Sequence, residues 1–207
     1  ANVNTKKLME YISSQKDQAI YFLQKLISFD STFINQGVGG NEGAIQEWLS
    51  KQLGEWGFET RLTEPNNEMI SSMPDYNPGH NYEGRPNLIA LSKGSGKGRS
   101  IILNGHIDTV PLDNIDLWNH HPLSACDMKA GVAAMILAVK YIKDCKMEHK
   151  GDILIESVVD EEGGGNGTLA CIAEGYTADA AIVTEPTGLK MFCASRGVFL
   201  LEVKVTG

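Results

Sequence analysis

The sequence has no long apolar run and no closely spaced pair of cysteines. No stretch of about 18 apolar residues occurs in the chain of 207 residues, and the N-terminus lacks the apolar segment of a secretion signal. The four cysteines form no C-x-x-C motif, which excludes a zinc ribbon and a disulfide framework. We therefore expect a soluble, cytoplasmic protein without a membrane partner, with its cysteines as buried free thiols.

Clusters of basic residues are also missing. The chain has 18 Lys and Arg against 26 Asp and Glu, a net charge of -8. Nucleic-acid binding requires clustered positive charge to meet the phosphate backbone, so we expect no nucleic-acid partner. An acidic balance does fit a site that holds cations. The hydrophobic share of 42% is that of an ordinary globular protein, and the length allows one α/β domain and the beginning of another.

The apolar pattern predicts helices and strands that alternate along the chain. Helical periodicity occurs at residues 19–27, 45–53 and 127–143, and short apolar runs typical of strands occur at 58–62, 87–91, 101–103, 153–155 and 181–183. The glycine-rich run at 94–98 leads into another strand rather than a helix, so it is a turn and not a phosphate-binding loop. The pattern predicts an α/β fold in which helix 127–143 connects parallel strands.

Three of the predicted strands run directly into residues that can bind metal. His106 and Asp108 follow the first, Asp160, Glu161 and Glu162 follow the second, and Glu185 follows the third. Open α/β sheets build their sites at the carboxyl ends of strands, which favours a common site. Asp108, two residues from His106, is expected to fix the orientation of the imidazole. A lone histidine or a solvated acidic turn would be the structural alternatives.

Asp127 opens the predicted helix 127–143, where a carboxylate is an ordinary helix cap. Capping and metal binding are compatible, because a carboxylate has two oxygens. Glu161 and Glu162 are adjacent, so their side chains diverge unless the three glycines at 163–165 let the backbone turn. These glycines could instead cradle an anion before a helix. Three consecutive carboxylates at a strand end would repel one another without a cation.

These motifs together resemble a known family. The runs Gly105-His106-Ile107-Asp108-Thr109-Val110-Pro111, Asp127-Met128-Lys129-Ala130-Gly131, Asp160-Glu161-Glu162 and Glu185-Pro186-Thr187 are similar in order and spacing to those of the dinuclear zinc hydrolases. That family includes acetylornithine deacetylase, succinyl-diaminopimelate desuccinylase, aminoacylase and glutamate carboxypeptidase. The resemblance is closest to the deacetylase/desuccinylase branch. It implies a three-layer α/β sandwich with a mostly parallel mixed sheet and an α+β lid domain.

The resemblance also implies a role for each site residue. His106 and Glu185 bind one zinc, Asp127 bridges two ions, and Glu162 binds the second. Glu161 is the general acid/base, Asp108 orients His106, and the Asp127–Met128 peptide bond is cis. Two divalent ions are implied, zinc foremost, with cobalt or manganese as alternatives.

The implied reaction is hydrolysis of an amide in an N-acyl amino acid or related small acyl amide by a zinc-bridging hydroxide. Glu185, rather than Asp, at the third strand end favours a deacylase. A metallo-dipeptidase or carboxypeptidase, a non-catalytic metal-binding relative and a structural module without metal remain alternatives. The acyl group cannot be read from the sequence.

Two departures from the family concern the length of the chain. Only nine positions separate Trp118 from Asp127, where the family has a longer segment, so we expect residues to be missing there and a mass above 22.5 kDa. We assign residues 1–188 to the N-terminal part of the catalytic domain and 189–207 to the first strand of the lid, truncated. In the complete protein we expect a further histidine ligand and a homodimer formed through the lid.

Overall fold

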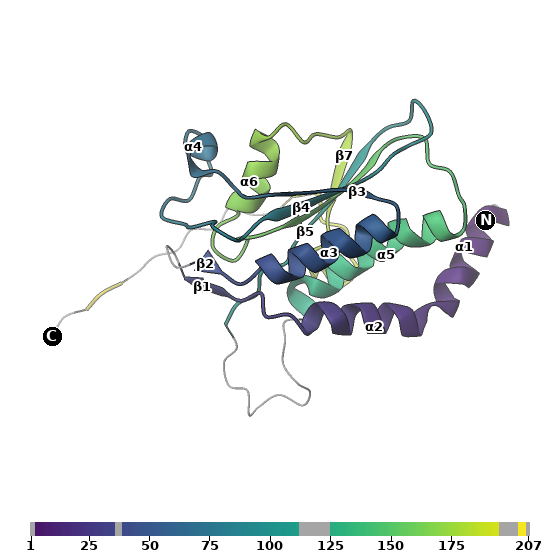
Figure 1. Cartoon of the computed structure of the whole chain (residues 1–207), viewed down its shortest axis with the longest axis horizontal. Helices are drawn as coiled ribbons and strands as arrows, with labels where there is room; N and C mark the ends of the chain where they lie inside the picture. The colour runs from purple at the N-terminus through teal and green to yellow at the C-terminus, as the bar shows by residue number, and fades with distance from the viewer. Residues whose placement is uncertain (1–2, 36–38, 112–124, 195–202, 206–207) are drawn as a thin grey trace.

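The chain forms a three-layer α/β structure in the computed structural model, which describes residues 3–35, 39–111, 125–194 and 203–205 (Figure 1). The helices are α1 (Val3–Ser14), α2 (Lys16–Ile27), α3 (Gly43–Glu55), α4 (Asn67–Ile70), α5 (Ala130–Asp144) and α6 (Asn166–Ala173). The strands are β1 (Phe33–Asn35), β2 (Gly39–Gly40), β3 (Glu59–Thr63), β4 (Asn87–Ser92), β5 (Ile101–His106), β6 (Ile153–Val158) and β7 (Ala180–Val183). The predicted α/β class and its mixed sheet are confirmed.

Five strands form the central sheet in the order β3-β4-β6-β5-β7. Strands β6, β5 and β7 run parallel, whereas β4 is antiparallel to both β3 and β6. Four of the five strands therefore point the same way, and β4 alone is reversed. The parallel strands β5, β6 and β7 end at one edge of the sheet, which brings the segments that follow them together.

Helices cover both faces of this sheet (Figure 1). Helices α2, α3 and α5 lie on one face, and α4 and α6 lie on the other. The alternation of side chains along β4 supplies both layers, because Leu88 and Ala90 pack into the large core under α3 and α5, whereas Ile89 packs with Cys171 of α6. A strand buried on both faces appears in the sequence as a continuous apolar run, as observed here.

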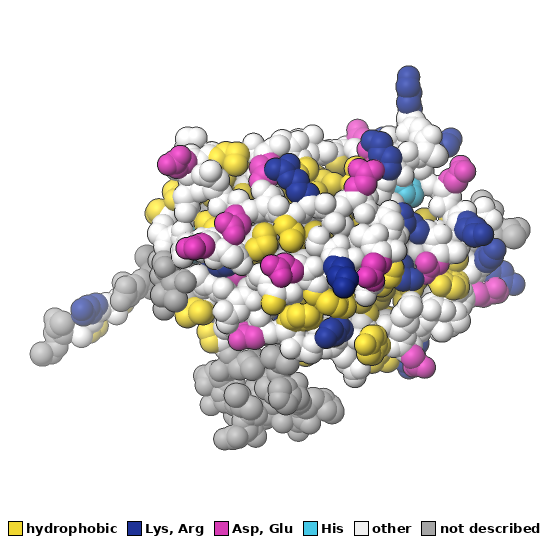
Figure 2. Space-filling model, in the orientation of Figure 1, with side chains coloured by type: hydrophobic (Ala, Val, Ile, Leu, Met, Phe, Trp, Pro, Cys, Tyr) yellow, Lys and Arg dark blue, Asp and Glu magenta, His cyan; other side chains and the backbone are white. Residues whose placement is uncertain are grey.

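The outer face of the helical layer carries charges of both signs. Figure 2 shows Lys and Arg side chains interspersed with Asp and Glu on the face where α2 and α3 lie. Apolar side chains lie between them, as on most protein surfaces. No helix within the described residues is both long and apolar enough to cross a membrane.

Several expectations need correction. The pattern predicted two helices before the sheet, but α1 also forms, with a weakly amphipathic sequence that the periodicity did not indicate. All four cysteines are free, but only Cys171 is buried; Cys126 and Cys193 are exposed in segments outside the core. Most of the predicted lid strand, and the suspected gap after Trp118, lie outside the described residues, so the domain boundary at residue 188 stays a prediction.

Candidate metal centre

His106 is the last residue of β5, and its imidazole is almost completely buried. Its Nδ1 lies 2.9 Å from the backbone oxygen of Asp108 and 3.5 Å from the carboxylate Oδ1 of the same residue. The Nδ1–H therefore donates to the Asp108 carbonyl, which leaves Nε2 free to face the site. The predicted contact between His106 and Asp108 thus forms mainly through the backbone.

The Asp108 carboxylate has a second function that the sequence did not indicate. Its two oxygens accept hydrogen bonds from the backbone N–H groups of Glu161 at 3.2 Å and Glu162 at 3.0 Å. This side chain is fully buried, so the two bonds are shielded from water. Asp108 therefore connects the end of β5 to the turn that follows β6.

Asp127 precedes α5 and does not cap it. The N-cap of α5 is Lys129, without a side-chain hydrogen bond, and the backbone of Asp127 is extended. The helix-cap interpretation was therefore wrong, because the carboxylate points instead toward His106, with Oδ1 at 3.1 Å from Nε2. The implied cis peptide bond between Asp127 and Met128 is confirmed.

The turn after β6 carries both glutamates. The amide of Gly165 donates to the Asp160 carbonyl at 2.8 Å, and the amide of Gly164 donates to the Glu161 carbonyl at 2.9 Å. Both glycines have positive φ, which a residue with a side chain rarely adopts. The prediction that these glycines allow a sharp turn is confirmed, and the turn leads directly into α6.

The predicted ligands converge at the sheet edge. Ligand atoms of His106, Asp127 and Glu162 all lie within 4.8 Å of one another. Two more carboxylates are near: the Glu161 and Glu185 oxygens lie 3.7 Å and 3.8 Å from His106 Nε2. The side chain of Asp127 is 58% exposed, so the cluster opens to solvent and to a substrate.

The electrostatics of this cluster favour a bound cation. Burial lowers the pKa of His106, but the hydrogen bond and charge of Asp108 and the charge of Glu161 outweigh it and raise the pKa to about 10. Burial, the largest effect, together with the neighbouring carboxylates, raises the pKa of Glu162 to about 7 against the opposing charge of His106. Burial also raises the pKa of Glu161 and of Glu185. A cation placed among these carboxylates would favour their ionised forms.

The donor set itself fits divalent metal ions. One imidazole nitrogen and several carboxylate oxygens are ligands that zinc accepts, and cobalt and manganese accept them as well. In the described part of the chain, the ion-pair partner of Asp127, Glu161 and Glu185 is His106 alone, which leaves an excess of negative charge for a metal to offset.

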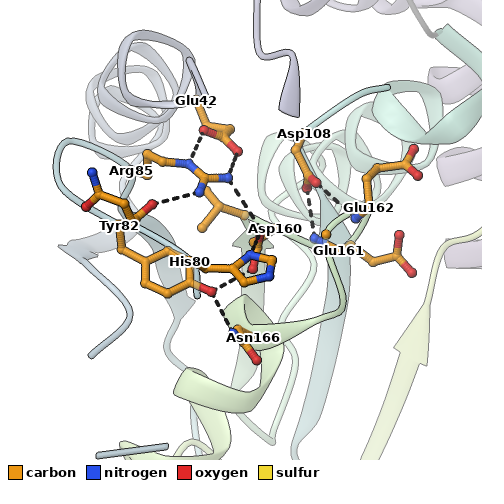
Figure 3. Close-up of polar contacts among 12 residues, drawn as sticks. Glu42, His80, Tyr82, Arg85, Asp108, Asp160, Glu161, Glu162 and Asn166 are labelled. Atoms are coloured by element: carbon orange, nitrogen blue, oxygen red, sulfur yellow. Dashed lines mark hydrogen bonds and ion pairs between the residues drawn. The ribbon is translucent and has the colours of Figure 1, made fainter. Parts of the chain in front are cut away.

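Asp160 behaves differently from the two glutamates beside it. The sequence suggested three carboxylates that repel one another, but the Asp160 side chain is fully buried and points away from the cluster (Figure 3). It contacts His80, Tyr82 and Arg85, none of which the sequence singled out. Their polar character between apolar runs was the only signal, and it does not distinguish a buried network from a surface loop.

Comparison with known proteins agrees with this geometry. The profile of peptidase family M20/M25/M40 matches residues 102–196. The N-formyl-4-amino-5-aminomethyl-2-methylpyrimidine deformylase of Bacillus subtilis (strain 168) is 33% identical over 199 residues, which cover 84% of this chain and 43% of the deformylase. A succinyl-diaminopimelate desuccinylase of Leptothrix cholodnii is 33% identical over 121 residues, which cover 50% of this chain and 32% of that enzyme.

Solved structures share the fold. Human carnosine dipeptidase 1 superposes with a TM-score of 0.68 at 18% identity, covering 87% of this chain and 41% of the dipeptidase. A tripeptidase of Staphylococcus aureus gives a TM-score of 0.61 at 23% identity, covering 82% of this chain and 43% of the tripeptidase. The chain thus spans less than half the length of these proteins.

Proposed function

We propose, from the premise that this chain belongs to peptidase family M20/M25/M40, that it supplies the metal-binding part of an amide hydrolase. The observation that carries the proposal is the convergence of His106, Asp127 and Glu162 within 4.8 Å at one edge of the sheet. Three carboxylates directed at one buried imidazole are costly without a cation and useful with one.

The metal ligands are assigned by the family resemblance together with these distances. His106 and Glu185 hold one divalent ion, Glu162 holds a second, and Asp127 bridges them. When bound, such ions lower the pKa of a coordinated water and polarise a substrate carbonyl. The buried bond from His106 Nδ1 to the Asp108 carbonyl keeps Nε2 available as the ligand atom.

Glu161 is the proposed general acid/base. Its carboxylate is half-exposed, and its Oε2 lies 3.7 Å from His106 Nε2, so it faces the site without being buried in it. The carboxylate accepts a proton from the attacking water and returns it to the leaving nitrogen as the amide bond breaks. Burial, the first cause, raises the pKa of Glu161 and so strengthens it as a base.

We propose an N-acyl compound as the substrate, cleaved by removal of a small acyl group. The support is that the two relatives described above are named as a deformylase and a desuccinylase. Dipeptides and peptides with a free carboxyl terminus are the second class, supported by the fold shared with a dipeptidase. We further propose zinc as the metal, a homodimer formed through the lid of the complete protein and a cytoplasmic location, all on the family resemblance.

The test uses the full-length protein with the substitution Glu161→Gln. We expect bound metal to stay at the wild-type level and kcat to fall by about 100-fold or more, because glutamine cannot carry the proton. The measurements are elemental analysis and turnover on a panel of N-formyl, N-succinyl and N-acetyl amides and dipeptides.

The matched control is Glu47→Gln on the exposed surface of α3, which removes a carboxylate away from the site and should leave kcat unchanged. Wild-type turnover in the Glu161→Gln protein would refute the assignment of the base. A wild-type protein that binds metal but cleaves nothing in the panel would instead favour a non-catalytic relative.

A further inference from the structure

A buried polar network lies directly behind the turn that carries Glu161 and Glu162 (Figure 3). We call it the Asp160 network, and its members are Glu42, His80, Tyr82, Arg85, Asp160 and Asn166. All six residues are buried. They come from the start of α3, the loop between α4 and β4, the turn after β6 and the start of α6, so the network joins four separate segments.

Asp160 is the centre of this network. Its carboxylate accepts hydrogen bonds from Tyr82 Oη at 2.6 Å and from His80 Nδ1 at 2.9 Å, and it lies 3.6 Å from Arg85 Nη2. The backbone of Asp160 has φ of 67°, in the left-handed region that residues other than glycine seldom adopt. Strong side-chain bonds at a residue with an unusual backbone conformation indicate that the network holds that conformation.

The remaining members fix the partners of Asp160. Arg85 donates from Nε and Nη2 to the two oxygens of Glu42, at 2.8 Å and 2.6 Å. Asn166 donates to the hydroxyl of Tyr82 at 2.7 Å. A two-pronged contact between arginine and carboxylate sets direction as well as distance, so Arg85 has little freedom to follow a moving Asp160.

The turn is therefore fixed from two sides. On the side of the metal centre, the Asp108 carboxylate accepts the amides of Glu161 and Glu162. On the far side, the network holds Asp160, the residue immediately before them. Adjacent side chains normally diverge, so the backbone at this turn determines where the two glutamates point. Buried ion pairs often contribute little to stability compared with apolar packing, which leaves this geometry as the better explanation for the charges.

We propose that Asp160 is a positioning residue, which acts through the backbone of Glu161 and Glu162 to direct the base and the metal ligand into the site. This inference rests on the proposed function for its catalytic consequence. The conformational consequence, an ordered turn at residues 160–165, does not depend on that function.

The test is Asp160→Asn in the full-length protein. Asparagine keeps the size of the side chain but replaces one acceptor oxygen with a donor, so it cannot accept from both Tyr82 and His80. We expect amide hydrogen exchange at residues 161–165 to rise by about 10-fold or more, because the turn opens locally. We also expect kcat to fall by about 10- to 100-fold, as for other residues that orient a ligand, with KM changed by less than about threefold.

Two further variants separate positioning from general stability. Glu156→Gln alters a buried carboxylate on β6 outside the network, and it should leave kcat and exchange in the turn unchanged. Tyr82→Phe removes one bond to Asp160 and keeps the ring, so it should give a smaller effect of the same kind and serves if Asp160→Asn does not fold. Exchange in the turn that matches wild type, or a kcat no lower than in Glu156→Gln, would overturn the proposal. A wild-type protein without hydrolase activity would count against the proposed function, whereas the exchange measurement would still decide the role of Asp160.

Discussion

Glu156 lies on β6 with its side chain buried between the sheet and α6. Its Oε2 accepts a hydrogen bond from Asn104 Nδ2 at 2.9 Å. Burial raises the pKa of Glu156, and the bond from Asn104 opposes that shift only in part. A carboxyl group that resists ionisation inside the fold makes stability depend on pH.

The sign of this dependence can be tested with Glu156→Gln. The folded pKa lies above the unfolded value of about 4.5, so the stabilisation is complete below that pH and is lost as the pH rises through the folded pKa. Glutamine does not titrate, and its carbonyl can still accept from Asn104. We expect the unfolding free energy of the variant, relative to wild type, to increase from pH 4 to pH 8, as measured by urea unfolding of the full-length protein. Parallel curves over about this range would contradict the prediction.

The start of α5 packs closely against the segment that leads from β7 to Glu185. A Cβ atom added at Gly131 would lie 2.1 Å from the backbone oxygen of Thr184, the residue before Glu185. Thr184 also continues the pairing of β7, because its amide donates to the Asn104 carbonyl at 3.1 Å. The absence of a side chain at Gly131 therefore allows the helix that follows Asp127 and the strand that precedes Glu185 to lie together.

Gly131→Ala should consequently disturb both stability and the site. We expect a loss of about 1–3 kcal/mol in unfolding free energy from overpacking, together with weaker metal binding as Glu185 moves. Urea unfolding and metal titration of the full-length protein would measure these effects. The control is Gly54→Ala in α3, where the nearest atom is 4.0 Å from the added Cβ. That variant should be neutral or more stable, because alanine favours a helix by about 1 kcal/mol over glycine. Equal effects of the two substitutions would show that the contact at Gly131 is unimportant.

At the scale of the whole molecule, the metal centre joins parts of the chain that are far apart in sequence. His106 comes from β5, Asp127 from the segment before α5, Glu162 from the turn after β6 and Glu185 from the segment after β7. A ligand that binds the folded state alone stabilises it according to its concentration and affinity. Ions held by these four segments would therefore stabilise the arrangement of the sheet edge.

Removal of the metal should lower the thermal stability of the full-length protein. At a metal concentration about 100 times Kd the stabilisation is roughly 2.7 kcal/mol, and a chelator should abolish it. We expect Tm to fall on dialysis against the chelator and to recover when zinc is added back, as followed by circular dichroism. An Asp127→Ala protein, which lacks the proposed bridging carboxylate, should respond much less. A Tm that is indifferent to both chelator and zinc would contradict a metal held by these residues.

The sequence alone determined the elements that surround the site and the residue types within it. Apolar runs that end in His106, Glu162 and Glu185 predicted strands, because a strand buried on both faces needs a continuous apolar sequence. The glycines after Glu162 predicted the turn, because few other residues adopt positive φ. These are local properties, and the chain encodes them within a few residues.

The tertiary structure decided which elements are neighbours and which groups share a contact. Strand β6 inserts between β4 and β5, although a short glycine-rich turn joins those two in the chain. Asp127 turns from helix capping to His106, and Asp160 turns from its acidic neighbours to Arg85, 75 residues away in the sequence. Such contacts depend on packing between distant segments, which no local pattern records. The same packing places the Asp108 carboxylate against the amides of Glu161 and Glu162.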